Sequence, residues 1–425
     1  MRGFLASSTG VTCAAALALP LAPPAAATTS SAPPATSPTA RPEAPAPGGT
    51  QSLRLTPLAR DRAPGAAEQG LRRQDVRQFS LVGVVWDSPA TELHGHVQVR
   101  TRATATGTWS GWQELETHNA DHAADPGTPE SASGRVRGAT APLWVGESDG
   151  VEVRVRAVDA PGTARSAPAA APLPTGLRLE LVDPGEAAPP PTNRARSEAE
   201  PSLLPARPAH PAHPARAARQ RAEPHVGSRP AITTRRGWGA DEKLREKGFV
   251  YTKKVKTAFV HHSATGNNYR CSQAPSVIRS IYRYHVNSTG WRDLGYNFLV
   301  DKCGNIYEGR AGGVSKPVLG AHTLGFNANS MGIAVLGTYS SKKPSSAALK
   351  AIARLTAWKV GLYGMNPRGK TYLKSGGGNL YRKGRKVRLN VISGHRDGFA
   401  TNCPGKQLYA KLDTARSKAA AYQGR

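Results

Sequence analysis

The sequence predicts an all-β domain followed by an α/β domain, joined by a proline-rich linker. Three observations predict this order. Apolar and charged residues alternate with a period of two in runs between residues 75 and 185. Residues 186–230 are rich in proline and alanine, which is typical of an extended spacer. Residues 231–425 combine short apolar runs with stretches of helical period, which is typical of mixed α/β structure.

The first residues are typical of an export signal. Arg2 precedes an uncharged stretch that is rich in Ala and Leu and ends in three alanines at 25–27. This pattern predicts a secretory signal peptide over residues 1–27, with a disordered start as the alternative. Export would place the remaining cysteines in an oxidising compartment. The following segment is mostly Ala, Pro, Ser, Thr and Gly, so we expect residues 28–74 to be disordered for lack of apolar surface.

The alternating runs of residues 75–185 predict an antiparallel β-sandwich. Gly, Pro and Asp separate the runs, as turns separate short strands. Strands are expected at Phe79–Trp86, Val97–Arg100, Val151–Arg156 and Leu177–Leu181. Trp109 and Trp112 form either a sugar-stacking platform or part of the core, and we favour the core. The role of this domain is open between a wall-binding module, a prodomain and a spacer.

The spacing of apolar residues also predicts the strands and helices of residues 231–425. Strands are expected at Lys256–Val260, Tyr296–Val300, Met331–Leu336 and Lys386–Ile392, and helices at Pro275–Val286, Pro344–Val360 and Leu408–Ala421. In the middle helix Leu349, Ile352 and Leu355 share one stripe, which would face the core. Pro344 suits the first helical position, where a backbone N–H is not needed.

Positive charge is concentrated in the second domain. The chain has a net charge of +28, and residues 231–425 hold 34 Lys and Arg against 8 Asp and Glu. An exported domain this basic suits anionic wall polymers. The domain lacks the aromatic and basic pattern of nucleic-acid binding, and no apolar run after the first thirty residues is long enough to span a bilayer. We therefore expect no nucleic-acid partner and no membrane span.

Three candidate zinc ligands lie in this domain. His261 ends an apolar run, His395 follows another, and Cys403 lies eight residues beyond His395. Two imidazoles and a thiolate suit zinc and leave one tetrahedral position for water. Successive side chains of a strand point to opposite faces, so only one of His261 and His262 can face the ion, and spacing alone does not choose. Taken singly, each histidine is more often an ordinary core or surface residue, and Cys403 could be a small buried hydrophobic side chain.

Six motifs of the second domain together resemble the peptidoglycan recognition protein and type 2 amidase family. In chain order they are Arg236-Gly237-Trp238-Gly239-Ala240, Val260-His261-His262-Ser263, Gly290-Trp291-Arg292-Asp293-Leu294-Gly295-Tyr296-Asn297-Phe298, Tyr307-Glu308-Gly309-Arg310, Gly320-Ala321-His322-Thr323, and Gly394-His395-Arg396-Asp397 leading to Cys403-Pro404-Gly405. They span nearly all of residues 235–415. The resemblance implies a central mixed sheet flanked by helices, with a groove that holds zinc.

The resemblance implies a zinc amidase that hydrolyses the amide between N-acetylmuramic acid and L-alanine of peptidoglycan. With the export signal and the basic charge, we expect a secreted, wall-associated protein, and we expect it to be a monomer. The resemblance also implies that His261, His395 and Cys403 bind Zn²⁺ and that Tyr296 is catalytic. Thr401 takes the position two before the cysteine, where other members have Lys or Thr, and is expected to be a second catalytic-site residue that acts by hydrogen bonding. Because Thr401 cannot act as a general base, Tyr296 and a metal-bound hydroxide are the candidates for the proton shuttle.

A further set of residues is expected to contact the substrate: His285, Trp291, Arg310, His322 and Asn327. The rival function is a recognition protein that binds peptidoglycan without cleaving it, because many family members have lost the third ligand. All three ligands are present here, which favours the enzyme.

Two features depart from the family pattern. Residues 311–317 lack the tryptophan that commonly follows the Glu-Gly-Arg motif, so the family's rule for the third stem residue does not apply. Cys271 and Cys303 do not match the closely spaced pair of animal members. In an exported chain we expect them to form a disulfide of their own, with two free buried thiols as the alternative.

Overall fold

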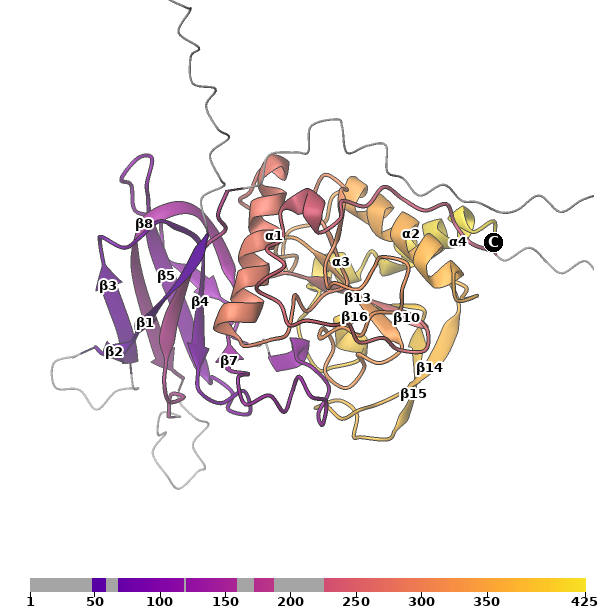
Figure 1. Ribbon diagram of the computed structural model, residues 1–425, viewed down its shortest axis with the longest axis horizontal. Helices are drawn as coiled ribbons and strands as arrows, with labels where there is room; N and C mark the ends of the chain where they lie inside the picture. Colours follow the sequence, from indigo (N-terminus) through magenta and orange to yellow (C-terminus); the bar gives the residue numbers. More distant parts are fainter. Residues whose placement is uncertain (1–47, 59–67, 118–119, 159–171, 187–224) are drawn as a thin grey trace, which may run out of the picture. The chain divides into compact units, whose positions relative to one another are not determined.

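The computed structural model describes residues 48–58, 68–117, 120–158, 172–186 and 225–425 (Figure 1). The predicted signal peptide over 1–27 and nearly all of the predicted linker over 186–230 lie outside these ranges. Within the described residues, no helix is long and apolar enough to cross a membrane.

Nine strands, all paired antiparallel, form the N-terminal domain. They are β1 (Gly49–Arg54), β2 (Thr56–Pro57), β3 (Glu68–Arg73), β4 (Phe79–Trp86), β5 (Gly95–Ala103), β6 (Gln113–Leu115), β7 (Gly138–Ala139), β8 (Leu143–Ala157) and β9 (Arg178–Asp183). The order is β1-β9-β4-β8-β3-β2, with β5 paired to both β8 and β6, and β7 paired to β4. On β8, Val151, Val153 and Val155 lie in the core with Val97 and Val99 of β5, which confirms the period of two.

The prediction of disorder over residues 28–74 was wrong for 49–57 and 68–73, which form β1, β2 and β3. β1 pairs with β9 from Gly49 opposite Asp183 to Arg54 opposite Arg178. These strands are mostly polar, and β1 and β2 lie at the two ends of the strand order. Edge strands commonly carry polar and charged side chains, so the composition of β1 and β2 did not reveal them as strands.

A mixed five-stranded sheet is the centre of the second domain. Its strands are β10 (Thr257–His262), β11 (Phe298–Val300), β12 (Ile306–Glu308), β13 (Ser330–Val335) and β16 (Ile392–Gly394), in the order β12-β11-β13-β10-β16. β10 runs parallel to β13 and β16, and β12 runs antiparallel to β11. This is the mixed sheet that the sequence resemblance implied.

The strand predicted over Lys386–Ile392 is divided in the structure. β15 (Lys386–Asn390) pairs with β14 (Lys370–Lys374) as a separate hairpin, and β16 enters the main sheet. The division follows from burial: Val387 and Leu389 pack in a small cluster with Phe259 and Phe326, whereas Ile392 packs in the main core.

Helices cover both faces of the mixed sheet. They are α1 (Ala274–Arg283), which continues into a π-helical turn (Tyr284–Ser288), α2 (Ser346–Gly361), α3 (Lys406–Tyr409) and α4 (Leu412–Tyr422). α2 and α4 share one core with Val260 and Ile333, whereas α1 packs with Leu299 and Ala334. α2 begins at Ser346 because the Ser345 hydroxyl accepts a hydrogen bond from the Ala348 amide, so Pro344 precedes the cap.

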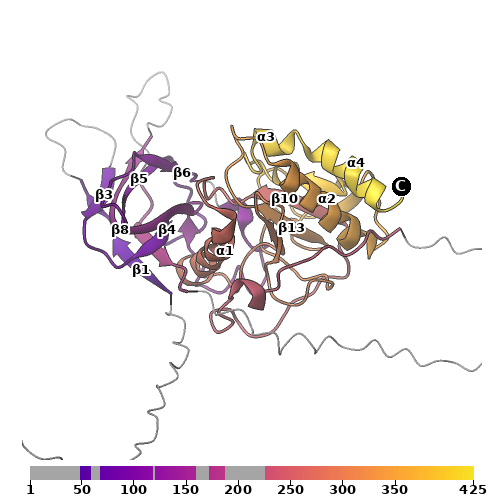
Figure 2. The same ribbon diagram turned by 90° about the horizontal axis from the view of Figure 1, so that it is seen from above.

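Helix α1 also packs against the N-terminal domain (Figure 2). Leu81 and Val85 of β4 share a buried cluster with Ile278 and Tyr284. Gly83 makes this approach possible, since a Cβ there would lie 2.4 Å from the Tyr284 hydroxyl oxygen. The two domains therefore share an apolar core, and their described residues belong to one compact unit.

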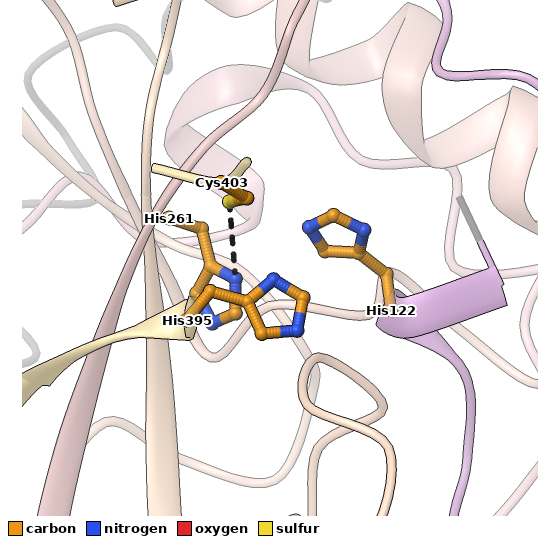
Figure 3. Close-up of side chains that lie close together, drawn as sticks. All are labelled: His122, His261, His395 and Cys403. Atoms are coloured by element: carbon orange, nitrogen blue, oxygen red, sulfur yellow. Dashed lines mark hydrogen bonds between the residues drawn. The ribbon is translucent and has the colours of Figure 1, made fainter. Parts of the chain in front are cut away.

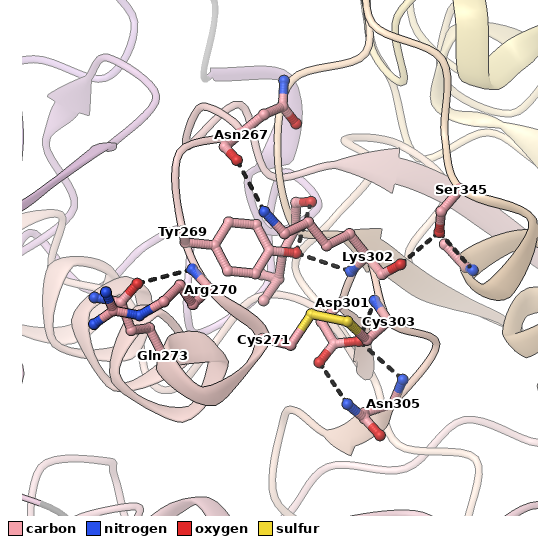
Figure 4. Close-up of a disulfide and its surroundings, with 12 residues drawn as sticks. Asn267, Tyr269, Arg270, Cys271, Gln273, Asp301, Lys302, Cys303, Asn305 and Ser345 are labelled. Atoms are coloured by element: carbon pink, nitrogen blue, oxygen red, sulfur yellow. Dashed lines mark hydrogen bonds between the residues drawn. A yellow bond between two sulfur atoms is a disulfide. The ribbon is translucent and has the colours of Figure 1, made fainter.

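The expected disulfide between Cys271 and Cys303 is confirmed (Figure 4). It joins the turn before α1 to the turn between β11 and β12. The same turn is held by the Asp301 carboxylate, which accepts hydrogen bonds from the backbone amides of Cys303 and Asn305. The two cysteines are 32 residues apart, and the loop that the bond closes contains α1, the helix that carries the domain interface.

Replacing both Cys271 and Cys303 with serine is expected to lower the free energy of unfolding by about 3–4 kcal/mol, because the open chain gains loop entropy when it unfolds. Denaturant unfolding of the oxidised protein and the double variant measures this difference. The reduced wild type is the matched control and should unfold like the variant. Equal midpoints for oxidised wild type and variant would contradict the prediction.

Candidate metal centre

Four buried side chains converge at the carboxyl ends of β10 and β16 (Figure 3). His261 lies on β10, His395 directly follows β16, and Cys403 lies in the loop beyond. His122 reaches the same point from the N-terminal domain. One ligand atom from each residue lies within 4.8 Å of the other three. Three imidazoles and one thiol are a donor set that suits zinc.

β10 determines which of its two histidines belongs to this group. His261 directs Nδ1 toward Cys403, at 3.8 Å from Sγ. His262 points to the opposite face, as strand alternation requires. There its Nδ1 accepts a hydrogen bond from the Tyr339 amide, and its Nε2 lies 3.3 Å from the Glu116 carboxylate.

One ring nitrogen of His395 makes a hydrogen bond, and the other makes none within the described residues. Its Nε2 lies 3.1 Å from the backbone carbonyl oxygen of Asp121, and a carbonyl only accepts, so Nε2 must carry the proton. Nδ1 is buried and makes no hydrogen bond within the described residues. A ligand histidine commonly donates its second N–H in this way. The Nδ1 lone pair of His395 is therefore available to a metal.

The electrostatics of the group fit a divalent cation. Burial lowers the pKa of His395 to about 3 and lowers that of His261 well below its usual value, so both imidazoles are neutral and can coordinate. Burial also raises the pKa of the Cys403 thiol. A zinc ion would supply the positive charge that stabilises the thiolate in this buried position.

Tyr296 and Thr401 lie beside the ligand group. The Tyr296 ring centroid is 5.4 Å from that of His261, and burial raises the pKa of its phenol, which therefore stays protonated near neutral pH and can donate a hydrogen bond. The Thr401 hydroxyl accepts a hydrogen bond from the Cys403 amide and so shapes the ligand loop. Tyr296, Thr401, Cys403 and His122 line one cavity of about 470 Å³.

Three of the expected substrate-contacting residues are buried near the centre. His285 packs on Trp291 with ring centroids 4.4 Å apart, and its Nδ1 accepts a hydrogen bond from the Gly295 amide. The His322 ring lies 5.3 Å from that of His261. It packs so closely on β13 that a Cβ at Gly332 would be 2.4 Å from its Cγ.

The other two expected residues, Arg310 and Asn327, contact the N-terminal domain. Arg310 forms a two-pronged ion pair with Glu130, with both N···O distances 2.8 Å. Asn327 Nδ2 donates to the backbone oxygen of Ala123 and to the Asp125 carboxylate. We call residues 121–130 the covering segment. Sequence reasoning did not identify it, because no motif or period distinguishes His122 from an ordinary polar residue.

Two family models match the chain. Residues 251–406 match "N-acetylmuramoyl-L-alanine amidase", and residues 24–175 match "Rv3811 N-terminal galactose-binding domain-like". The second domain thus has the amidase fold, and the N-terminal β-domain is of the galactose-binding-like type.

Named relatives match the second domain. Peptidoglycan-recognition protein SC2 of Drosophila simulans is 32% identical over 159 residues, which are 37% of this chain and 72% of that protein. The human N-acetylmuramoyl-L-alanine amidase is 32% identical over 193 residues, which are 44% of this chain and 28% of that protein. A crystal structure of peptidoglycan recognition protein-LE in complex with tracheal cytotoxin, a monomeric diaminopimelic acid-type peptidoglycan, is 30% identical; the match covers 43% of this chain and 93% of that one, with a TM-score of 0.33.

Proposed function

Because the chain belongs to the peptidoglycan-recognition protein and N-acetylmuramoyl-L-alanine amidase family, we propose that it is a secreted zinc amidase. It would hydrolyse the amide between N-acetylmuramic acid and the L-alanine of the stem peptide. One observation carries this proposal. His261, His395 and Cys403 form a complete, buried ligand set, and Tyr296 lies directly against it.

Bound zinc would polarise the scissile carbonyl and lower the pKa of a water molecule at the site. The protein holds His261 and His395 as neutral ligands through burial. Tyr296 keeps its proton and can donate a hydrogen bond to the carbonyl oxygen as that oxygen gains negative charge. Thr401 holds the loop of Cys403, a positioning role rather than proton transfer.

We propose that the substrate lies over His285, Trp291, Arg310, His322 and Asn327. The Arg310 guanidinium supports this placement, because it binds both oxygens of the Glu130 carboxylate. The stem peptide of peptidoglycan carries carboxylates that could bind Arg310 in the same way. The disulfide supports an exported protein, because such bonds persist in oxidising compartments.

Mass analysis of a digested, chemically defined muropeptide tests the proposal against the non-catalytic alternative. An amidase releases an intact stem peptide with a free N-terminal alanine and leaves the sugar unmodified. A metal chelator should stop the release, and zinc should restore it. Binding of the muropeptide with no cleavage, in every variant that retains zinc, would favour the recognition protein instead.

The basic surface of the second domain supports attachment to walls. Arg382, Lys383, Arg385 and Lys386 are all exposed near the β14–β15 hairpin. Replacing the four with Glu should weaken binding to whole walls at low salt, because attraction to anionic polymers would become repulsion. Hydrolysis of a small soluble muropeptide should change far less, since cleavage depends on the metal centre and on Tyr296 beside it.

High salt is the matched control for this charge reversal. The screening length is about 10 Å at 0.1 M salt and falls as salt rises, so wild-type binding to walls should fall toward that of the variant. A co-sedimentation assay over a salt series measures both. If binding to walls changes neither with salt nor with the four substitutions by Glu, the positive charge of this surface serves solubility alone.

A further inference from the structure

His122 enters the metal centre of a different domain. It ends a short helical turn (Ala120–His122), and its ring centroid lies 4.5 Å from that of His395 and 5.3 Å from that of His261. Figure 3 shows its ring directed at the other three side chains. We propose that His122 is a fourth protein ligand to the zinc and that the N-terminal domain thereby holds the enzyme in a latent form, an inference that rests on the proposed function.

The environment of His122 supports coordination. The residue is 6% exposed, and neither ring nitrogen makes a hydrogen bond within the described residues. Nδ1 lies 2.8 Å from the carboxylate of the adjacent Asp121, in a geometry unsuited to a hydrogen bond. Burying polar nitrogens without a partner costs free energy. A zinc ion between the four side chains would give His122 that partner.

A fourth protein ligand changes what the centre can do. Catalytic zinc sites keep three protein ligands and one open position, whereas sites with four protein ligands are closed. His261, His395 and Cys403 alone leave the open position that amide hydrolysis needs. With His122 bound, that position is filled by the protein, and His122 must withdraw before a water or a substrate carbonyl can take its place.

The covering segment also binds to the groove. The backbone oxygen of Asp121 accepts hydrogen bonds from His395 Nε2 and from the Leu324 amide. The Asp125 carboxylate accepts from the Gly325 amide at 2.8 Å and from Asn327 Nδ2 at 2.7 Å. These bonds fix His122 on both sides, so its place at the metal centre does not depend on its own side chain alone.

Glu130 is a further contact of the covering segment with the second domain. Its carboxylate pairs with Arg310 and also accepts a hydrogen bond from the Arg292 amide at 3.2 Å. Both members of the ion pair are more than 90% buried, at 6% and 8% exposed. Arg310 and Asn327 are the residues expected to contact substrate. Substrate and covering segment therefore compete for the same partners, which argues for inhibition and against a catalytic role for His122.

Metal spectroscopy tests the ligand directly and without turnover. The full chain is loaded with Co²⁺ in place of zinc, and its visible spectrum is recorded with and without azide, a small anion that binds open metal positions. The wild type should not respond to azide, because His122 fills the position. His122→Ala should respond, and its zinc should be lost to a chelator about 100-fold faster, since losing even an outer partner costs 10–100-fold in affinity.

His94→Ala is the matched control, because His94 is an exposed histidine of the same domain. It should behave as the wild type in both measurements. Identical azide responses and zinc loss in wild type and His122→Ala would overturn the inference, whatever the enzyme activity. His122→Asn, which keeps size and polarity, serves if the alanine variant does not fold, and it should also respond to azide.

Hydrolysis of a soluble muropeptide tests latency. His122→Ala should cleave at least about 10-fold faster than wild type, and Asp125→Ala should also be faster, because it loosens the segment while all four ligands remain. Slower cleavage by a zinc-loaded His122→Ala would overturn the inference and make His122 a catalytic residue. An azide response with no cleavage by any variant would support His122 as a ligand and contradict the proposed amidase.

Discussion

Replacing Cys403 with serine is expected to abolish measurable hydrolysis and to weaken zinc binding by about 100-fold or more. A serine hydroxyl does not ionise near neutral pH and is a poor zinc ligand, whereas the buried thiolate contributes both a soft donor and a compensating charge. Cys403 is 3% exposed, so its thiolate is largely shielded from bulk water. Metal analysis after dialysis against a chelator, together with an activity assay, measures both effects.

The size of the zinc loss depends on His122. If His122 coordinates, Cys403→Ser still offers three imidazoles and retains a weakened site, whereas His122→Ala/Cys403→Ser offers two ligands and should retain no zinc. The two substitutions should therefore not be additive, as expected for residues that share one partner. Full zinc retention by both the single and the double variant would show that Cys403 is not a ligand.

Tyr296→Phe is expected to lower kcat by about 10²–10³-fold, by analogy with the loss of one hydrogen-bond donor to a developing oxyanion. KM should change little, because the lost interaction would form only as the carbonyl oxygen gains charge. Zinc content should stay at the wild-type level, since the ring, which packs 5.4 Å from His261, is preserved. Initial rates on a soluble muropeptide over a range of concentrations give both constants.

Tyr372→Phe is the matched control for this substitution, because Tyr372 is 47% exposed on β14 and lies outside the metal centre. It should have wild-type kinetics. Unchanged turnover in Tyr296→Phe would remove Tyr296 from the chemistry. An equal loss in kcat and in zinc content would assign it a structural role instead.

The part of the site that the sequence predicted is local to one domain. His261 and His395 each end an apolar strand, and Cys403 lies in the loop that follows, so a family motif marks each of them. Spacing alone did not choose between His261 and His262, and the family resemblance implied His261. The contact of His261 with Cys403 places this histidine, on its face of β10, in the candidate metal centre.

His122 could not be predicted, because its position depends on how two domains dock. The apolar run of Phe79–Trp86 predicted a strand there, but it did not show that Leu81 and Val85 would pack on α1. That contact docks the two domains, and the bonds of Asp121, Asp125 and Glu130 then hold the covering segment against the second domain. A ligand supplied by another domain leaves no spacing pattern in the sequence.

The burial of the tryptophans in the N-terminal domain was also only partly predictable from the sequence. Trp86 and Trp144 are buried, but the core assignment was wrong for Trp112, which is 37% exposed. The Arg154 guanidinium lies 4.2 Å from the Trp112 ring centroid, so a cation stacks on the ring where a core residue was expected. The sequence identifies Trp112 as aromatic, but it does not show that Arg154 of β8 stacks on the ring.

Mass analysis of a defined disaccharide-peptide digested by wild type, His122→Ala and Cys403→Ser distinguishes a latent zinc amidase from a binding protein. Wild type should release an intact stem peptide with a free N-terminal alanine slowly, His122→Ala should release it faster, and Cys403→Ser should not release it. A zinc-loaded His122→Ala that binds the muropeptide and leaves this amide intact would contradict the proposed amidase.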